Sequence, residues 1–355
     1  MQALSARATG PSQAKQADGI WRIDFQWGWE ADPDHERKPE NIELRVRALL
    51  GPHVPFELVW ASVYTFACRR MDAFRHGRVL FAGDAPHGVS PFGARGANSG
   101  VQDADNLGWK LAAVLQGQAP EALRDTYALE REAAADENIR HSTRSTDFIT
   151  PKSPVSRMFR DAVLQLSRQH DFARSLVNSG RLSMPSVHAG SPLVTPDEDA
   201  FAGPLLPGAP APDAPLDGEG WLLRRATHTG FTALVFGDGE GCASASGCEG
   251  AGADIDANAD AVKAALKALS GSGLNTVCIP RTPGHAIAWQ RYDALPGTVY
   301  LLRPDPHVCA RWRRPTPAAV AAALDRALGR IAAPDTEPFA PSTSNAETPH
   351  RKALA

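Results

Sequence analysis

The residues of this sequence that are best placed to do chemistry lie between positions 78 and 115. A short apolar run, residues 78–82, leads into Gly83 and Asp84. The following loop is rich in glycine, at positions 88, 93, 96 and 100. Glycine lets a ligand approach the backbone closely, and a helix that starts at about Asn98 would present unpaired N–H groups and the positive end of its dipole. A carboxylate at a strand end can accept hydrogen bonds from ligand hydroxyls. The pattern therefore predicts a site for an anionic or electron-rich ligand.

The elements that position this site are predicted from hydrophobic periodicity. Residues 78–82 are expected to form a short buried strand, and residues 98–115 a helix. The apolar side chains of that helix are predicted to share one face: Leu107, Leu111, Val114 and Leu115, with Val101 and Ala104 one turn earlier. Further helices are expected over residues 121–140 and 155–177.

The region before the site is expected to be a sheet with one helix. Residues 20–27 alternate apolar and polar side chains, as in a half-buried strand. Residues 57–66 are rich in β-branched and aromatic residues, which also favour a strand. Between them, residues 39–50 have helical spacing and stop at Gly51-Pro52. Residues 1–19 show no periodicity and are expected to be a loose, disordered arm.

A second unit is expected after a proline-rich connector. Residues 203–217 contain five prolines in fifteen positions, which excludes helix and central strand. The elements expected beyond it are strands at 231–236, 276–279, 298–302 and 308–312, a helix at 258–269 after the first strand, and a final helix. Thr316 as N-cap and Pro317 at the first helical position suit the start of that last helix. The tail, residues 331–355, has no apolar pattern and is expected to be disordered.

The composition excludes several classes of protein. With 43% hydrophobic and 22% charged residues, the 355-residue chain is globular and long enough for two or three domains. The balance of 37 Lys+Arg against 40 Asp+Glu argues against nucleic-acid binding. No apolar run approaches the roughly 18 residues of a membrane helix. Five cysteines without Cys-x-x-Cys spacing indicate reduced thiols, so a cytoplasmic location is expected.

An ordered set of motifs carries a family resemblance. Gly-Asp-Ala-Pro-His stands at 83–87, Ser-Pro at 90–91, Arg-Gly-Ala-Asn at 95–98, and Asp-Ala-Asp-Asn-Leu-Gly-Trp-Lys-Leu at 103–111. In this order and spacing the segment resembles the FAD-dependent aromatic hydroxylases, group A flavoprotein monooxygenases with the para-hydroxybenzoate hydroxylase fold. A run of this length is far more specific than a single glycine-rich triplet.

The resemblance implies a set of FAD-contacting residues: Asp84, Pro91, Arg95, Gly96, Ala97 and Asn98. Asp84 would accept a hydrogen bond from the ribityl chain, and the backbone of residues 96–98 would meet the pyrimidine edge of the flavin. Arg95 would add positive potential near the reduced, anionic flavin. Pro91 would lie where the loop separates flavin from substrate.

The resemblance also implies the reaction. In the family, NAD(P)H reduces the flavin, O2 forms a flavin C4a-hydroperoxide, and its distal oxygen attacks an activated aromatic ring. The chain is thus expected to be a monooxygenase of phenolic or other small aromatic substrates, with FAD as cofactor, NAD(P)H as co-substrate and no metal; a homodimer is left open. Because the cofactor does the difficult chemistry, no side chain is assigned a catalytic role. Tyr64 is a candidate substrate contact, with a packed core tyrosine as the alternative, and His87 is interpreted as a structural loop histidine.

The fold class implied is mixed, α/β and α+β. Residues 20–76 resemble the substrate-domain sheet, residues 77–202 the carboxyl-terminal part of the FAD-binding domain, and residues 218–330 the thioredoxin-like domain of the phenol-hydroxylase branch. In that last domain Cys242 and Cys248 replace the usual Cys-x-x-Cys, so packing or oligomerisation is a more suitable role for it than redox chemistry.

One family feature is absent from the sequence. No Gly-x-Gly-x-x-Gly, the turn that holds the ADP pyrophosphate, occurs in the 355 residues. The chain is therefore expected to be the carboxyl-terminal portion of such an enzyme, either as a truncated product or with the other half supplied separately. The alternative function is a non-catalytic remnant that acts as a folding or oligomerisation module.

Overall fold

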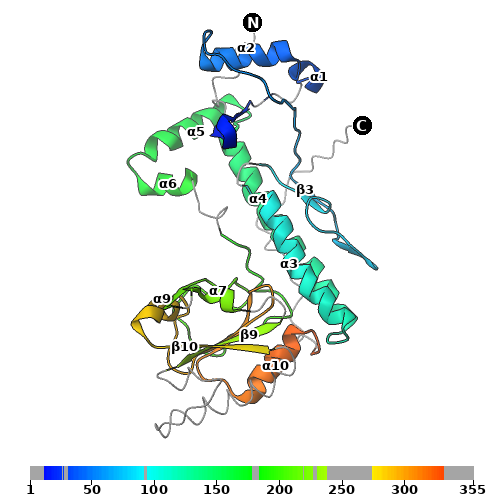
Figure 1. The fold of residues 1–355 in the computed structure, drawn as a ribbon, viewed down its shortest axis with the longest axis vertical. Coiled ribbons are helices and arrows are strands. Elements are labelled where there is room, and N and C mark those ends of the chain that lie inside the picture. Colours follow the sequence, from blue (N-terminus) through cyan, green and yellow to red (C-terminus); the bar gives the residue numbers. More distant parts are fainter. Residues whose placement is uncertain are drawn as a thin grey trace.

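A computed structural model of the chain describes residues 12–25, 27, 31–91, 94–177, 184–218, 220–226, 230–237 and 274–331. Figure 1 shows an elongated arrangement, with the N-terminal elements at one end, a long helical hairpin in the middle and a compact sheet with helices at the other end. No helix of these residues is both long and apolar enough to cross a membrane. The chain is a mixed α/β structure, in agreement with the sequence.

The N-terminal elements differ in part from the prediction. β1 (Ser12–Lys15) pairs antiparallel with β2 (Trp21–Asp24), and a 3-10 turn (Ala17–Gly19) joins them, so the described part of the expected loose arm is ordered. β2 is mostly exposed rather than half-buried. α1 (Pro33–Glu36) precedes α2 (Pro39–Leu50), which has the predicted bounds and ends at Gly51 with φ +101°.

The strand expected over residues 57–66 does not form. Residues 54–65 make no backbone hydrogen bond to the backbone of any residue that the structure describes. A strand requires hydrogen bonds to a neighbouring strand to complete its ladder, and none is present here among the described residues. Several large apolar side chains of this segment are exposed, with Trp60 at 78% and Val59 at 69%, whereas Val63 and Phe66 are half-buried.

Two short antiparallel strand pairs, one enclosed by the other in the chain, flank the start of the predicted loop. β3 (Arg69–Arg70) pairs with β6 (His87–Gly88), and β4 (Arg75–His76) pairs with β5 (Val79–Leu80), both antiparallel. The buried strand expected at 78–82 is thereby reduced to two residues of a hairpin edge, where Val79 is 55% exposed.

The middle of the molecule is an antiparallel pair of helices. α3 (Gly96–Leu115) and α4 (Asp125–Ile149) are joined through a 3-10 turn (Glu121–Arg124). The predicted apolar face of α3 is right only in part. Leu107 and Val114 pack half-buried against hydrophobic cores, but Val101 and Leu115 are exposed. The fully buried side chains are Ser99, Asp103, Asn106, Trp109, Lys110 and Ala113. The helix expected at 155–177 is two helices, α5 (Pro154–Leu166) and α6 (Asp171–Val177).

A four-stranded sheet of order β10-β9-β11-β12 forms the far end of the molecule. Its strands are β9 (Phe231–Gly237), β10 (Leu274–Pro280), β11 (Val299–Leu302) and β12 (Val308–Trp312). β9 and β10 are parallel, while β11 runs antiparallel to β9 and β12. The four strand predictions are confirmed, and the predicted helix at 258–269 lies outside the described residues.

Short elements surround this sheet. They are β7 (Pro215–Leu216), β8 (Gly220–Trp221), α7 (Leu222–Arg225), a 3-10 turn (Pro283–His285), α9 (Ala286–Arg291) and α10 (Pro317–Ala327). At the start of α10 the Thr316 hydroxyl accepts from the Ala319 N–H, and Pro317 takes the first helical position, which confirms the predicted cap.

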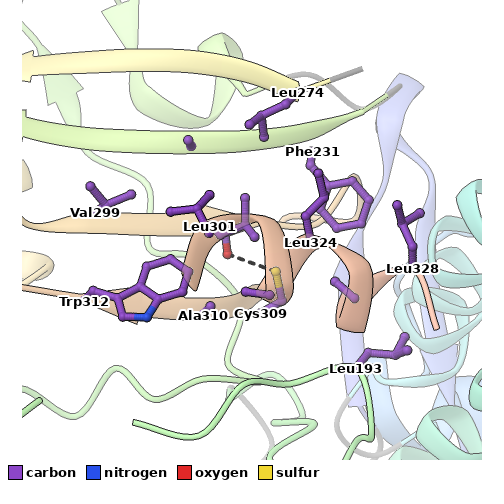
Figure 2. Close-up of a cluster of buried hydrophobic side chains, with 14 of the residues drawn as sticks. Leu193, Phe231, Leu274, Val299, Leu301, Cys309, Ala310, Trp312, Leu324 and Leu328 are labelled. Carbon is purple, nitrogen blue, oxygen red and sulfur yellow. Dashed lines mark hydrogen bonds between the residues drawn. The ribbon is translucent and has the colours of Figure 1, made fainter. Parts of the chain in front are cut away.

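The two faces of the sheet bury alternate residues of the same strands. On one face Phe231 and Leu301 pack with Leu324 of α10 (Figure 2). The same cluster includes Trp109 and Leu123 of the helical hairpin. On the other face Phe236 and Leu302 pack against α9 and the proline-rich segment. The sheet therefore has one core that it shares with α3, and this core fixes the hairpin against it.

Candidate cofactor site

The turn that carries Asp84 is packed directly against the first turns of α3. Gly83 has φ +69°, and its N–H donates to the Asp103 carboxylate at 2.9 Å. A Cβ on Gly100 would lie only 3.3 Å from the Gly83 Cα, so glycine at position 100 permits this close approach. The predicted juxtaposition of the acidic turn and the helix start is thus present.

The predicted cofactor residues lie on the outer side of this junction. Asp84, Pro91, Ala97 and Asn98 are exposed, Gly96 is half-buried and Arg95 is buried. The Arg95 Nη2 donates to the Met184 carbonyl at 2.6 Å, and the Asn98 side chain donates to the Ala94 carbonyl at 2.7 Å.

The start of α3 is suited to an electron-rich ligand. The side chain of its N-cap residue, Arg95, does not cap this helix, and the first helical turn contains no acidic residue. Its first N–H groups therefore have no partner within the helix and carry partial positive charge. The exposed Asp84 carboxylate can accept hydrogen bonds from the hydroxyls of a ligand. The N–H groups at the start of α3 can donate to acceptor atoms elsewhere on the same ligand.

Tyr64 does not have the surroundings of a core tyrosine. Its side chain is 75% exposed and its ring stacks on Phe66, with the centroids 6.5 Å apart. The core-packing alternative for this residue is therefore wrong, and the substrate contact stays a prediction.

Three buried charged or polar side chains lie beneath the surface of the loop that contains Asp84. His87 Nε2 lies 2.7 Å from the Asp103 carboxylate, and Arg131 Nε donates to the same carboxylate at 2.6 Å. Burial opposes the charge on Asp103, but the hydrogen bond from His87 and the Arg131 guanidinium outweigh it and hold the pKa of Asp103 below its usual value. These contacts agree with the interpretation of His87 as a structural histidine.

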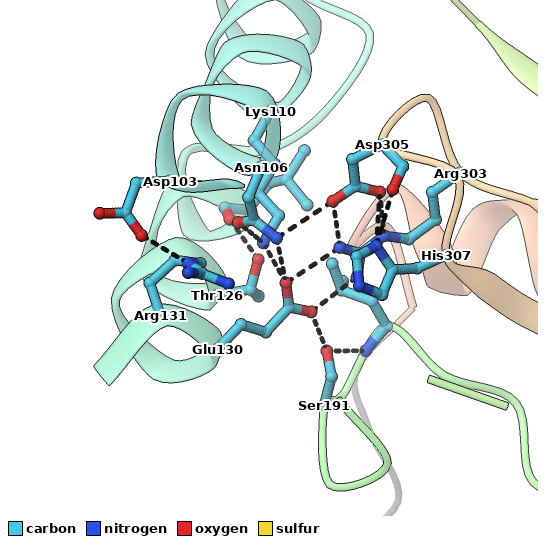
Figure 3. Close-up of polar contacts among 12 residues, drawn as sticks. Asp103, Asn106, Lys110, Thr126, Glu130, Arg131, Ser191, Arg303, Asp305 and His307 are labelled. Carbon is cyan, nitrogen blue, oxygen red and sulfur yellow. Dashed lines mark hydrogen bonds and ion pairs between the residues drawn. The ribbon is translucent and has the colours of Figure 1, made fainter. Parts of the chain in front are cut away.

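The four-stranded sheet and the elements that surround it, from β7 to α10, are called the sheet unit below. Sequence reasoning missed a buried network of charges between the helical hairpin and this sheet unit. Figure 3 shows its members on α3, α4 and the loop between β11 and β12: Asn106, Lys110, Glu130, Arg303 and Asp305. The i, i+3 and i+7 spacing of Asp103, Asn106 and Lys110 was a signal that these polar residues share one helix face. Arg303, which binds Glu130 in this network, is 173 positions away from it, and no local pattern reveals that contact.

The network balances two cations against two carboxylates in an environment without solvent. The Glu130 carboxylate accepts from Lys110 Nζ at 2.8 Å and from Arg303 Nη1 at 2.7 Å. Burial lowers the pKa of Lys110 to about 8, although the attraction of Glu130 opposes this shift. For Glu130 itself, burial acts to raise the pKa, but Arg303 and Lys110 hold it well below the usual range. Such a group is stable only while each charge keeps its partners.

Two hollows occur among the described residues. One of about 520 Å³ is an open depression along α5, lined by residues from Pro154 to Gln165, and does not adjoin the loop. The other, of about 200 Å³, includes Gln102, Arg131 and His307 in its lining and is smaller than the roughly 300–1,000 Å³ of typical ligand pockets. Within the residues described, no group of three or more His, Cys, Asp or Glu side chains could hold a metal ion.

Comparisons with known proteins match the part of the chain that contains the loop. Residues 5–142 match the family described as FAD binding domain. The 3-(3-hydroxy-phenyl)propionate/3-hydroxycinnamic acid hydroxylase of Mycolicibacterium vanbaalenii is 40% identical over 152 residues, 42% of this chain and 26% of that protein. A flavin-dependent monooxygenase of Mycobacteroides abscessus is 38% identical over 183 residues, 51% of this chain and 33% of that protein.

Solved structures of flavin-dependent enzymes are similar to a longer part of the chain. The rebeccamycin biosynthetic enzyme RebC, solved with reduced flavin, is 26% identical with a TM-score of 0.63, over 88% of this chain and 55% of RebC. The flavin-dependent monooxygenase PieE, at 20% identity and a TM-score of 0.63, shares the fold. This chain thus spans about a quarter to a third of these two curated relatives and about half of RebC. The resemblance to FAD-dependent aromatic hydroxylases is confirmed.

Proposed function

We propose that this chain carries the flavin-edge part of an FAD-dependent monooxygenase that hydroxylates a phenolic or other small aromatic substrate with NAD(P)H and O2. The observation that carries the proposal is the exposed Asp84 turn, which packs against the uncapped start of α3. This junction lies inside the segment that matches the FAD binding domain. A cytoplasmic location and a dimeric assembly accompany the proposal as expectations.

The residues present fit the cofactor. The Asp84 carboxylate would accept hydrogen bonds from ribityl hydroxyls, and the N–H groups at the start of α3 would donate to the pyrimidine edge of the flavin. The guanidinium of Arg95, anchored on the Met184 carbonyl, would add positive potential beside that edge. Pro91 is exposed in the same loop and would separate flavin from substrate. When bound, FAD would supply electron transfer from NAD(P)H and the activation of O2.

The names of the relatives favour a phenolic substrate. The M. vanbaalenii protein and a Burkholderia vietnamiensis protein are both named as 3-(3-hydroxy-phenyl)propionate/3-hydroxycinnamic acid hydroxylases. We extend to this chain only the substrate class, an aromatic ring activated by a hydroxyl. Exposed Tyr64 remains a candidate contact for that hydroxyl.

The proposal assigns the two ends of the cofactor to different units. The Gly-x-Gly-x-x-Gly turn is absent from the 355 residues, so we assign the ADP portion to a unit that carries this motif. The strand order β10-β9-β11-β12, with one parallel and two antiparallel pairs, supports a thioredoxin-like assignment of the sheet unit. Its contacts with the hairpin support a packing role for that unit.

The experiment is the visible spectrum of the purified chain after incubation with excess FAD and desalting. A retained flavin band in the wild type and in Asp72→Ala, a matched exposed carboxylate outside the site, would show that this chain holds the flavin end without the ADP-binding unit. Asp84→Ala is expected to lose the band, because the ribityl hydroxyls lose their acceptor. If the folded wild type retains no flavin, the chain is not by itself a flavoprotein. The folding-module alternative then stands, and the exposed Val59 and Trp60 favour it.

A further inference from the structure

The buried charge network and the support under the Asp84 turn share the same two helices. On α4, Glu130 and Arg131 are adjacent residues that contact different partners. On α3, Asp103 and Asn106 lie one turn apart and do the same. The two helices therefore contact the sheet unit on one side. On the other side they contact the turn at Gly83 and Asp84, called the cofactor turn below.

Arg303 is the main contact from the sheet unit. Its guanidinium donates from Nη1 and Nη2 to the two oxygens of Glu130, at 2.7 and 3.1 Å. The same guanidinium donates to both oxygens of Asp305, at 2.8 Å from Nε and 2.5 Å from Nη2. Asp305 in turn accepts from the Asn106 side chain at 3.1 Å. A planar fork that binds two carboxylates at once fixes the angle between the loop and α4 as well as the distance.

The next residue of α4 carries the contact to the cofactor turn. Arg131 donates to Asp103, and the second oxygen of that carboxylate accepts the Gly83 N–H at 2.9 Å. Asp103 is fully buried and Arg131 nearly so, so neither has water as a substitute partner. A rotation of α4 that follows the loss of Arg303 would displace Arg131 and release Gly83, the residue before Asp84.

We propose that Arg303 is a positioning residue for the cofactor turn, acting through Glu130, the α4 backbone, Arg131 and Asp103 on the Gly83 N–H. The sheet unit thereby sets the geometry of Asp84 from a distance. The consequence for FAD affinity rests on the proposed function, whereas the consequence for the Gly83 turn does not.

The test is amide hydrogen exchange of the full chain without cofactor, comparing the wild type with Arg303→Met. We expect faster exchange in residues 81–88, by between about twofold and about thirtyfold, the range that couplings of this kind span. The strands β9 to β12 should exchange as in the wild type. Arg330→Met is the matched control, because Arg330 also joins the sheet unit to the hairpin, through the Gln118 carbonyl, but does not touch Glu130. It should leave residues 81–88 unchanged.

Two outcomes would overturn the proposal: exchange that rises evenly over the whole chain, or a change confined to residues 303–307. If Arg303→Met does not fold, Arg303→Lys replaces it, since lysine keeps the charge but cannot bind both carboxylates as a fork. It should show the same selective increase at a smaller size. Asp84→Ala separates this proposal from the function, because it should abolish flavin retention while residues 81–88 stay protected. If the chain retains no FAD but Arg303→Met still shows faster exchange confined to residues 81–88, only the proposed function is contradicted.

Discussion

At the residue scale, His188 is a buried imidazole whose ring has unusual neighbours. It is 6% exposed, its ring centroid lies 4.7 Å from that of His307, and its Nε2 has no hydrogen-bond partner among the described residues. Burial lowers the pKa of His188 to about 3, although the nearby Glu130 carboxylate opposes the shift. The folded protein therefore keeps this histidine neutral at pH values where an exposed one is charged.

This predicts a loss of stability in mild acid. Between about pH 6.5 and pH 3 the unfolded chain binds a proton at His188 that the folded chain does not, so the free energy of unfolding falls as the pH falls, by at most roughly 1.4 kcal/mol per pH unit. Urea unfolding at pH 6.5 and pH 5 measures the slope, in a window above the range where the carboxylates titrate. His188→Gln should flatten it, and His170→Gln, at an exposed site, should not. An unchanged slope in His188→Gln contradicts the assignment.

At the element scale, the proline-rich segment is an edge of the sheet unit. The Gly208 N–H donates to the Val308 carbonyl at 2.6 Å, and the Val308 N–H donates to the Ala209 carbonyl at 2.9 Å. The Gly208 carbonyl also accepts from the His188 N–H at 2.8 Å. Gly208 thus lies between β12 and the segment that carries His188, with φ +90° and no room for a side chain.

Gly208→Ala is predicted to destabilise the protein more than Gly218→Ala. Both glycines have positive φ, which costs alanine about 1–2 kcal/mol. A Cβ at position 208 would also lie 2.5 Å from the His188 carbonyl carbon, whereas at position 218 nothing lies within 4 Å. Overpacking adds roughly 1–3 kcal/mol. Equal losses of unfolding free energy in the two variants, measured in urea, would show that the segment does not pack on β12 as described.

The elements that could be predicted from the sequence are those whose signal is local. The Thr316 cap, the end of α2 at Gly51 and the four strands of the sheet depend on neighbouring residues and were found. The buried polar side chains of α3 could not be found, because periodicity assumes that polar side chains face water. Here they face Glu130 and Arg303, whose proximity depends on the whole fold.

At the scale of the whole molecule, burial is unevenly distributed. The cores of buried side chains lie between the hairpin and the sheet and on the far side of that sheet, and Phe74 joins a small cluster on α4. In contrast, the extended residues 54–65 expose Trp60 and Tyr64 and make no backbone hydrogen bond to a described residue's backbone. Local opening is least costly where contacts are few.

Native chymotrypsin digestion should therefore cut after Trp60 and Tyr64 well before it cuts after Phe74 or Tyr127, both fully buried. A protease needs an extended, accessible backbone, which residues 54–65 already have. Mass spectrometry of the early products identifies the cuts, and Trp60→Gln/Tyr64→Gln should delay them. The fragment that begins after Tyr64 should keep the melting midpoint of the intact chain, because it retains all three cores. A lowered midpoint, or equally early cleavage after Tyr127, would mean that the N-terminal elements contribute to the stability of the hairpin and the sheet.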